Sequence, residues 1–339
     1  MKKISLAIAL LSVLPLAAQA QTSVTIYGIA DASVGIEDTD APGTDSRTVI
    51  SSGTQSTSRI GFRGTEDLGN GLKALFNIEA GIALDSGAQD AAGLFQRRAV
   101  VGLQGSFGTV TVGREYSPIA AVVQSSDPLG HGFYGSNLGS FGTGRATRRL
   151  PNSVNYKSEA LSGFTVQAAY SAGERQNDNP SGSLVGVSVE YKNGPLNLGA
   201  GYHQVENLAT GDDEEFAFGA GYNFGAFDLR GSYVMADPEG PLPEFKFTTV
   251  GGSFTAGASK FFASVHQQRV DTGGRGNGFS LAYQYTLSKR TNLYSSYGRV
   301  RNNNGGNFGL TSAGGTFAPP PTAFGADPSV FNVGVRHSF

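Results

Sequence analysis

The chain has no cysteine and no tryptophan, and it has only four histidines. Without cysteine no disulfide can form, so burial and hydrogen bonding must hold the fold together. The histidines are far apart and lack metal-ligand spacing, and neither a G-x-S-x-G elbow nor a catalytic triad pattern is present. The sequence therefore predicts no metal, no cofactor and no enzymatic activity, that of a membrane phospholipase included.

An excess of positive charge is also missing, because 25 Lys and Arg stand against 27 Asp and Glu. This balance indicates no nucleic-acid partner. Long apolar runs are missing as well. No segment after the N-terminus reaches the roughly 18 apolar residues that a membrane-spanning helix needs.

The N-terminus has the three parts of a secretory signal peptide. Two lysines precede an apolar run over 4–16, and residues 18–20 (Ala-Gln-Ala) form an A-x-A cleavage site. We expect residues 1–20 to be removed and the mature chain to begin at Gln21.

Residues that favour strands and turns are abundant, with 49 Gly, 13 Tyr and 22 Phe. Apolar and polar residues alternate in many segments: Val24 and Ile26 share one face of the first, and Thr25 and Tyr27 share the other. The mean hydropathy of −0.16 suits a barrel in which half of each strand faces water. Sixteen segments are predicted as strands: 23–34, 59–63, 72–82, 95–104, 109–116, 152–158, 164–172, 183–191, 196–205, 215–224, 227–235, 247–254, 260–270, 278–287, 292–300 and 330–339.

The connections between these segments alternate in length. Short turns, such as 192–195, follow long loops, such as 38–57, 117–148 and 301–329. Short connections at one end and long ones at the other are typical of outer-membrane barrels. The third long loop, 117–148, shows no alternation, and a compact domain rarely keeps so long a connection unless it is functional. We expect this loop to fold inward and narrow the barrel.

In lipid every backbone amide must be paired within the protein, which only helices and closed sheets achieve. The predicted fold class is therefore all-β: a 16-stranded antiparallel transmembrane β-barrel that forms one domain over residues 21–339. The alternative is a secreted soluble β-sandwich or propeller. The apolar and polar faces of the predicted strands are so well separated that a soluble protein of this kind would expose too much apolar surface.

Six motifs, which occur in the expected order and span the mature chain, resemble those of one family. They are SVTIYG at 23–28 with Asp31, SRIGFRGTEDLG at 58–69, RRAVVGL at 97–103, GTVTVGR at 108–114, PNSVNY at 151–156 and VGVRHSF at 333–339. The family is that of the trimeric general porins of Gram-negative outer membranes, of the beta-proteobacterial type.

The resemblance implies a homotrimer in the outer membrane, with the third long loop folded into each pore. It implies a water-filled channel for passive diffusion of small hydrophilic solutes and ions, in contact with lipopolysaccharide and membrane lipids. It also implies that the last strand, 330–339, carries the signal that the outer-membrane insertion machinery recognises. The outward residues of that signal are Phe331, Val333, Val335, His337 and Phe339.

Arginines are the candidate pore-lining residues. Four of them alternate with apolar neighbours that we assign to lipid, and a charge facing lipid at mid-membrane would cost ~2–4 kcal/mol. These four are Arg59, Arg63, Arg98 and Arg149. Arg114 shares a face with Val110 and Val112, and the pore position implied by the resemblance would require a β-bulge.

The candidate acidic side of the constriction comprises Asp127, Glu115 and Glu79. These carboxylates, and Glu66, could instead form structural ion pairs with the arginines. Because rings of arginine favour anions, the sequence predicts an anion-leaning channel.

Two alternative functions remain at this point. A solute-specific channel would need a ladder of aromatic residues along the lumen, and alternation reveals none. A barrel that anchors an adhesive surface would need larger loops. Acidic loop residues at 38–45 and 212–215 could hold divalent cations that bridge to lipopolysaccharide phosphates.

Overall fold

A computed structural model describes residues 23–90, 93–142, 144–174 and 181–339. The predicted signal peptide lies outside the described residues. The first strands are β1 (Ser23–Asp38), β2 (Arg47–Ser52), β3 (Arg59–Gly69), β4 (Leu72–Gly81), β5 (Arg98–Gly105), β6 (Gly108–Tyr116), β7 (Arg149–Lys157), β8 (Phe164–Ser171), β9 (Leu184–Asn193) and β10 (Leu196–Val205). The others are β11 (Asp213–Asn223), β12 (Phe227–Asp237), β13 (Phe245–Ala256), β14 (Ser259–Val270), β15 (Arg275–Thr286), β16 (Thr291–Asn302), β17 (Leu310–Ser312), β18 (Gly315–Phe317) and β19 (Ser329–Ser338).

Two short helices, α1 (Pro118–Ser125) and the 3₁₀-helix η1 (Asn137–Ser140), lie in loop 117–148. No helix in the described part of the chain is long and apolar enough to span a membrane.

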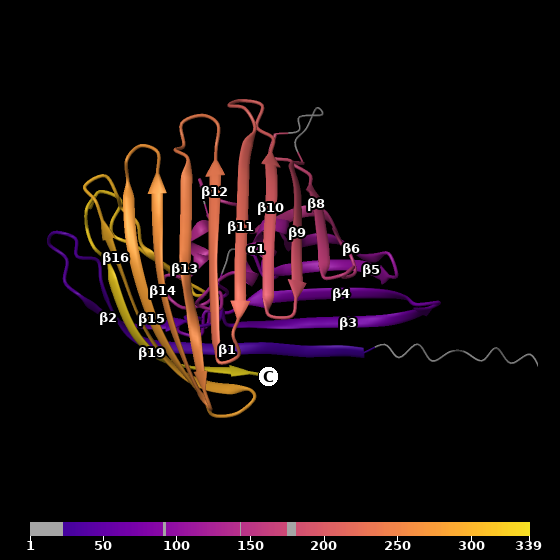
Figure 1. The fold of residues 1–339 in the computed structure, drawn as a ribbon, viewed down its shortest axis with the longest axis horizontal. Helices are drawn as coiled ribbons and strands as arrows, with labels where there is room; N and C mark the ends of the chain where they lie inside the picture. The colour runs from indigo at the N-terminus through magenta and orange to yellow at the C-terminus, as the bar shows by residue number, and fades with distance from the viewer. Residues whose placement is uncertain (1–22, 91–92, 143, 175–180) are drawn as a thin grey trace, which may run out of the picture.

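Seventeen strands form one antiparallel sheet that closes on itself (Figure 1). Over Ala32–Glu37 β1 pairs with β2, and over Ser23–Ile29 it pairs with β3. β2 and β3 together therefore make up one strand of the barrel. The circumference therefore has sixteen strands, as predicted. On its other edge β1 pairs with β19, and Gly28 and Phe339 exchange two backbone hydrogen bonds of 3.1 Å.

The prediction of an uninterrupted loop over 38–57 is wrong. β1 continues to Asp38, and β2 pairs with it from Arg47 to Ser52. The segment Arg-Thr-Val-Ile-Ser-Ser is mostly polar, so its alternation is weak, yet Ile50 still points outward with 65% of its surface exposed.

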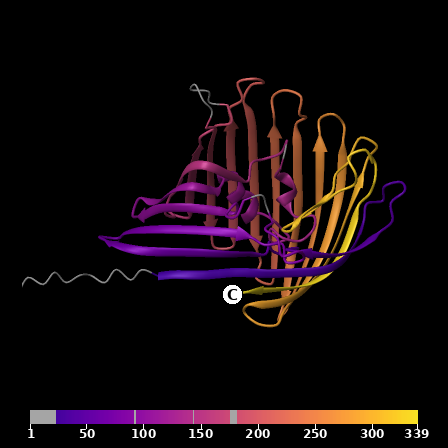
Figure 2. The ribbon, with the colours of Figure 1, turned by 180° about the vertical axis from the view of Figure 1, so that it is seen from behind.

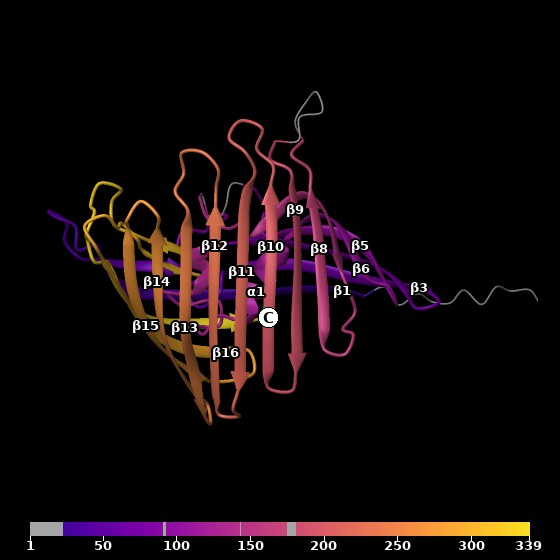
Figure 3. The same ribbon diagram turned by 45° about the horizontal axis from the view of Figure 1, so that its top comes forward.

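The two faces of the sheet differ as lipid and water require. On β1 the side chains of Val24, Ile26, Val34 and Ile36 are more than half exposed on the outer surface, whereas those that alternate with them, such as Asp31, are buried inside. Long connections gather at one end of β8–β15 and short turns at the other (Figure 3).

Loop 117–148 lies inside the barrel. α1 packs on the inner face of β9, β10 and β11, and η1 on that of β12 and β13 (Figure 2). Ile119, Val122 and Val123 of α1 are completely buried there. Together with a hairpin of β17 and β18 from loop 303–328, this loop fills part of the lumen.

Candidate functional site

The start of loop 117–148 is fixed by helix capping. Ser117 Oγ accepts a hydrogen bond from the Ala120 N–H at 3.3 Å, and Pro118 occupies the first helical turn, where its missing N–H is not needed. Ser117 also donates through Oγ to the Thr147 carbonyl at 2.6 Å. The two ends of the loop are thus joined at the wall.

A glycine of the inner wall makes room for the end of α1. Gly219 of β11 faces the lumen, and a Cβ at this position would lie 2.5 Å from Ser126 Oγ. Its neighbour Phe218 points outward and is 53% exposed. Strand alternation therefore puts bulk towards lipid and leaves room for the helix inside.

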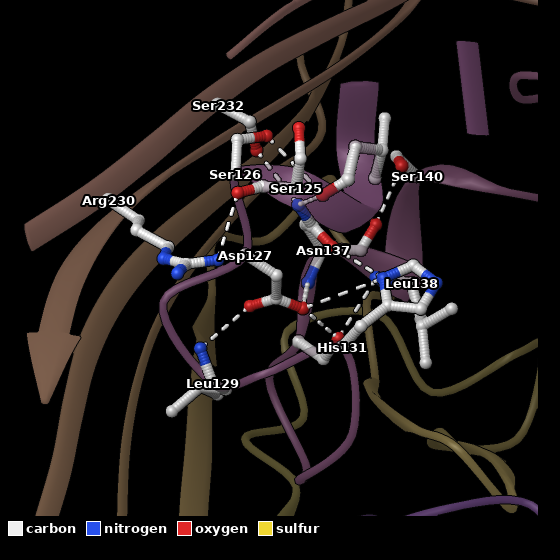
Figure 4. Close-up of polar contacts among 12 residues, drawn as sticks. Ser125, Ser126, Asp127, Leu129, His131, Asn137, Leu138, Ser140, Arg230 and Ser232 are labelled. Atoms are coloured by element: carbon white, nitrogen blue, oxygen red, sulfur yellow. Dashed lines mark hydrogen bonds and ion pairs between the residues drawn. The ribbon is translucent and has the colours of Figure 1, made fainter. Parts of the chain in front are cut away.

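Asp127 organises the middle of the loop (Figure 4). Its carboxylate accepts hydrogen bonds from the Leu129 N–H at 2.8 Å, the Asn137 N–H at 3.2 Å and the Ser136 hydroxyl. Burial raises the pKa of Asp127 to about 6, although these hydrogen bonds oppose the shift. The side chain has no exposed surface, so it lies within the loop rather than on the face that a solute would meet.

His131 lies beside Asp127, with 3.9 Å between its Nδ1 and a carboxylate oxygen. Its Nε2 lies 3.2 Å from the guanidinium of Arg148. Burial, and then repulsion from Arg148, lower the pKa of His131 to about 3. The imidazole is therefore neutral, and it connects the loop to the arginines on the opposite wall.

Glu79 of β4 is the centre of that basic wall. Arg97 donates to its carboxylate at 2.6 Å, Arg59 lies 3.7 Å away, and the Tyr27 hydroxyl donates at 3.1 Å. This single carboxylate is fully engaged by its neighbours, so it offers little free negative charge to the lumen.

Tyr116 extends the network towards the end of the loop. Its hydroxyl accepts from Arg97 at 3.3 Å and from Arg149 at 3.2 Å, and both Arg148 and Arg149 lie over its ring. The buried Nε atoms of Arg148 and Arg149 have no hydrogen-bond partner among the described residues. Burial, and then repulsion from Arg149, lower the pKa of Arg148 to about 9, so it stays charged at neutral pH.

The remaining predicted residues lie around this network. Arg98 donates to Glu115 at 2.5 Å and 3.0 Å, so each of the two charges is compensated by the other. Arg63 lies over the ring of Tyr27 at 5.0 Å. Arg114 donates to the Gln96 carbonyl at 2.6 Å.

An irregularity does lie beside Arg114, but the extra residue is in β7. Gly113 pairs with Ser153 and Glu115 with Leu150, so three steps on β7 face two on β6. Asn152 there has a φ of 50°, which asparagine tolerates better than most residues. Across β5, Arg114 still faces Ala99.

Sequence reasoning missed Arg97, Arg148 and Tyr116. The predicted strand 95–104 includes Arg97 and gives it the parity of Ala99 and Val101, but β5 begins only at Arg98, so alternation does not apply to Arg97. The arginine doublets 97–98 and 148–149, each at a strand entrance, were the available signal.

The outward residues of β19 are Phe331, Val333, Val335 and His337, and Phe339 follows the strand; all five are exposed. The described ranges contain no group of three or more His, Cys, Asp or Glu that could hold a metal ion.

Comparison with known proteins identifies the family. The model of the Gram-negative porin family matches residues 6–305. Outer membrane porin protein 32 of Delftia acidovorans is 35% identical over 360 residues, covering 100% of both chains. An outer membrane porin protein of Bordetella pertussis is 36% identical over 369 residues, covering 89% of this chain and 95% of that protein.

A solved structure agrees. An anion-selective porin from Comamonas acidovorans superposes with a TM-score of 0.85 at 31% identity, covering 94% of this chain and 100% of the other. The chain therefore belongs to the Gram-negative porin family, and it is a channel protein of the outer membrane rather than an enzyme.

Proposed function

We propose that the channel prefers anions and that the arginine network beside loop 117–148 sets this preference. The observation that carries the proposal is an excess of positive charge at one level of the lumen. Five arginines gather there with two carboxylates, Glu79 and Glu115, and both carboxylates are paired. The arginines are Arg59, Arg97, Arg98, Arg148 and Arg149.

The loop side does not restore the balance. Asp127 was the predicted acidic counterpart, but it is buried and hydrogen-bonded within the loop. An uncompensated charge at ~8 Å in water-like dielectric acts on a passing ion with about 0.5 kcal/mol. Three excess charges then act on a monovalent ion with about 1.5 kcal/mol, favourable for an anion and unfavourable for a cation. The difference of about 3 kcal/mol corresponds to roughly a hundredfold preference before salt screens part of it.

The reversal potential of the trimer in a planar bilayer under a KCl gradient tests the proposal. We expect the potential to lie towards the chloride value and to move to zero as salt rises from 0.1 M, where the Debye length is about 10 Å, towards 1 M. A potential on the potassium side at low salt would overturn it.

General diffusion, rather than transport of one solute, fits the luminal aromatics. Phe133, Tyr294 and Phe247 face the lumen but are buried against loop 117–148 or the wall. Among the described residues they offer no exposed track along which a solute could slide, so we propose that size and charge select the solutes.

We further propose a homotrimer in which the outer face of β1–β6 forms the subunit interface. On these strands the exposed large side chains are Val, Ile and Leu, whereas exposed Phe and Tyr occur on β7 and later strands. Ala30 and Ala32 of β1 add small residues that permit close approach in lipid. Ala80, which also has outward parity, is already buried within the chain and drops out of this surface.

Ala32→Trp tests the interface, and Ala200→Trp on the outer face of β10 is its matched control. We expect the first variant to run as a monomer in mild detergent and the second to stay trimeric. Trimers that survive Ala32→Trp would place the interface elsewhere.

Recognition of β19 by the insertion machinery and contact with lipopolysaccharide remain proposals. The exposed, alternating outer face of β19, which is followed by the exposed Phe339, supports the first. Divalent bridging at 212–215 has less support, because Asp212, Glu214 and Glu215 already accept hydrogen bonds from Gln204, Tyr202 and Thr147.

A further inference from the structure

Two buried wall residues hold both ends of loop 117–148. His203 of β10 and Glu215 of β11 are directly opposite each other, and their side chains are joined by a hydrogen bond of 2.7 Å. His203 Nε2 accepts from the Ile119 N–H at 3.3 Å, at the start of α1. Glu215 accepts from the Thr147 N–H at 2.8 Å and from its hydroxyl at 2.6 Å, at the other end of the loop.

The donors decide the protonation state of this pair. A backbone N–H can only donate, so Nε2 must carry the lone pair, and Nδ1 must carry the hydrogen that it donates to the Glu215 carboxylate. His203 is therefore a neutral imidazole in this arrangement. Gly186 of β9 gives the ring its place, because a Cβ there would lie 2.5 Å from the imidazole.

The contact also completes the first turn of α1. Pro118 has no N–H, and Ser117 satisfies the Ala120 N–H, so His203 takes the donor that remains between them. A protonated His203 would present an N–H to this N–H and to the positive end of the helix, both of which are unfavourable.

We propose that His203 and Glu215 are positioning residues, which hold loop 117–148 at a fixed depth in the lumen, and that proton uptake by His203 releases the α1 end. The Glu215–Thr147 contact remains in that state, so acid frees one end of the loop and not the other. The loop then fluctuates in the ion path while the hydrogen-bonded sheet of the barrel remains intact.

The surroundings of His203 favour this reading. β11 presents Glu215, with Asp213 next to it on the same face; β9 presents Gly186; α1 has no charged residue. The arginines that flank Thr147 are held elsewhere: Arg145 donates to the Gly139 carbonyl, and Arg148 contacts His131. In the described part of the chain, Glu215 is thus the charge that His203 meets.

Two substitutions separate the two contacts of the imidazole. The carbonyl of His203→Gln reaches the position of Nε2 and can accept from Ile119, whereas that of His203→Asn is too short to do so and reaches only the level of Nδ1. Neither variant takes up a proton. Glu190→Gln is the matched control, because Glu190 is a buried, inward residue of β9 that has no hydrogen bond to the loop among the described residues.

The test records open-channel current noise in planar bilayers at pH 7 and pH 5, after circular dichroism and heat-modifiable gel mobility have shown folded barrels. We expect a severalfold rise in noise for the parent at pH 5. His203→Asn should be noisy at both values and His203→Gln quiet at both, and Glu190→Gln should follow the parent. Equal noise in the Asn and Gln variants, or an acid-induced rise that persists in His203→Gln, would overturn the proposal.

This readout is independent of anion preference. Reversal potentials at pH 7 should be the same in the parent and the two His203 variants, because neither substitution changes a charge at that pH or touches the arginine network. A failure of the charge proposal would alter the sign of that potential and leave the noise pattern intact.

Discussion

On the side of β8–β13 the inner wall on which loop 117–148 packs is mostly small and apolar and contains the His203–Glu215 pair, whereas on the side of β3–β7 it carries arginines. The first side contributes bulk and is dry, since Ile119, Val122 and Val123 are completely buried. The second side contributes charge, and Arg59 and Arg98 keep 24% and 34% of their side-chain surface exposed. We therefore propose that width and selectivity are set by different walls of one channel, so that each can be changed while the other stays intact.

The largest effect should follow removal of the packed side. Deletion of residues 126–141, joined by a short Gly-Ser linker, removes η1 and the Asp127 network. A sixteen-stranded interior is wide enough for an open aqueous channel, so single-channel conductance should rise severalfold. Unchanged conductance in a folded, trimeric variant would mean that the loop does not limit ion flow.

A smaller change should follow when the packed side is overfilled. Gly219→Val places a branched side chain where a Cβ already lies 2.5 Å from Ser126 Oγ, so α1 must move towards the lumen axis. Overpacking of this kind costs typically about 1–3 kcal/mol, and conductance should fall while the reversal potential stays constant. Gly221→Val, one inward position along β11, is the control, because the nearest atom to its Cβ is the flexible Arg230 side chain at 3.3 Å.

How far the sequence could lead differs between the two walls. Period-two alternation was sufficient for sixteen strands, because lipid demands an apolar outer face at every second residue. It could not show that Asp127 is buried, since this depends on Ser136 and Asn137 folding back over it. The His203–Glu215 pair was equally hidden, because only the register of β10 and β11 places the two residues opposite each other.

The charged side should respond in selectivity rather than in width. Arg97→Ser and Arg149→Ser each remove one charge from the network, and each should lower the anion-to-cation permeability ratio by about fivefold at low salt, corresponding to ~1 kcal/mol between anion and cation. Arg98→Ser also leaves Glu115 unpaired, and its shift should be at least as large. If the reversal potential moves towards the potassium value in none of the three variants, the arginines of this wall do not set ion selectivity.

The smallest effect concerns the point where the two sides meet, at Asp127 and His131. The pKa of Asp127 is raised from 3.8 to about 6 in the packed loop, so acidification from pH 7 to 5 protonates it there and not in the unfolded chain, which stabilises the fold. The pKa of His131 is lowered from 6.5 to about 3, so the same acidification protonates it only in the unfolded chain, which destabilises the fold. Each contribution amounts to about 1–2 kcal/mol over this range, and in the parent they largely cancel.

Single substitutions should therefore reveal opposite pH dependences. In Asp127→Asn, His131 is the one member of the pair that still titrates. The thermal unfolding midpoint of this variant should therefore fall by a few degrees relative to the parent between pH 7 and pH 5. His131→Asn leaves Asp127 alone and accommodates the φ of 62° at this position, and its midpoint should rise relative to the parent over the same range. All other titrating groups are common to the three proteins, so their contributions cancel in these differences. If the midpoints of both variants shift in the same direction relative to the parent, Asp127 and His131 do not have the opposite pKa shifts that we attribute to their burial.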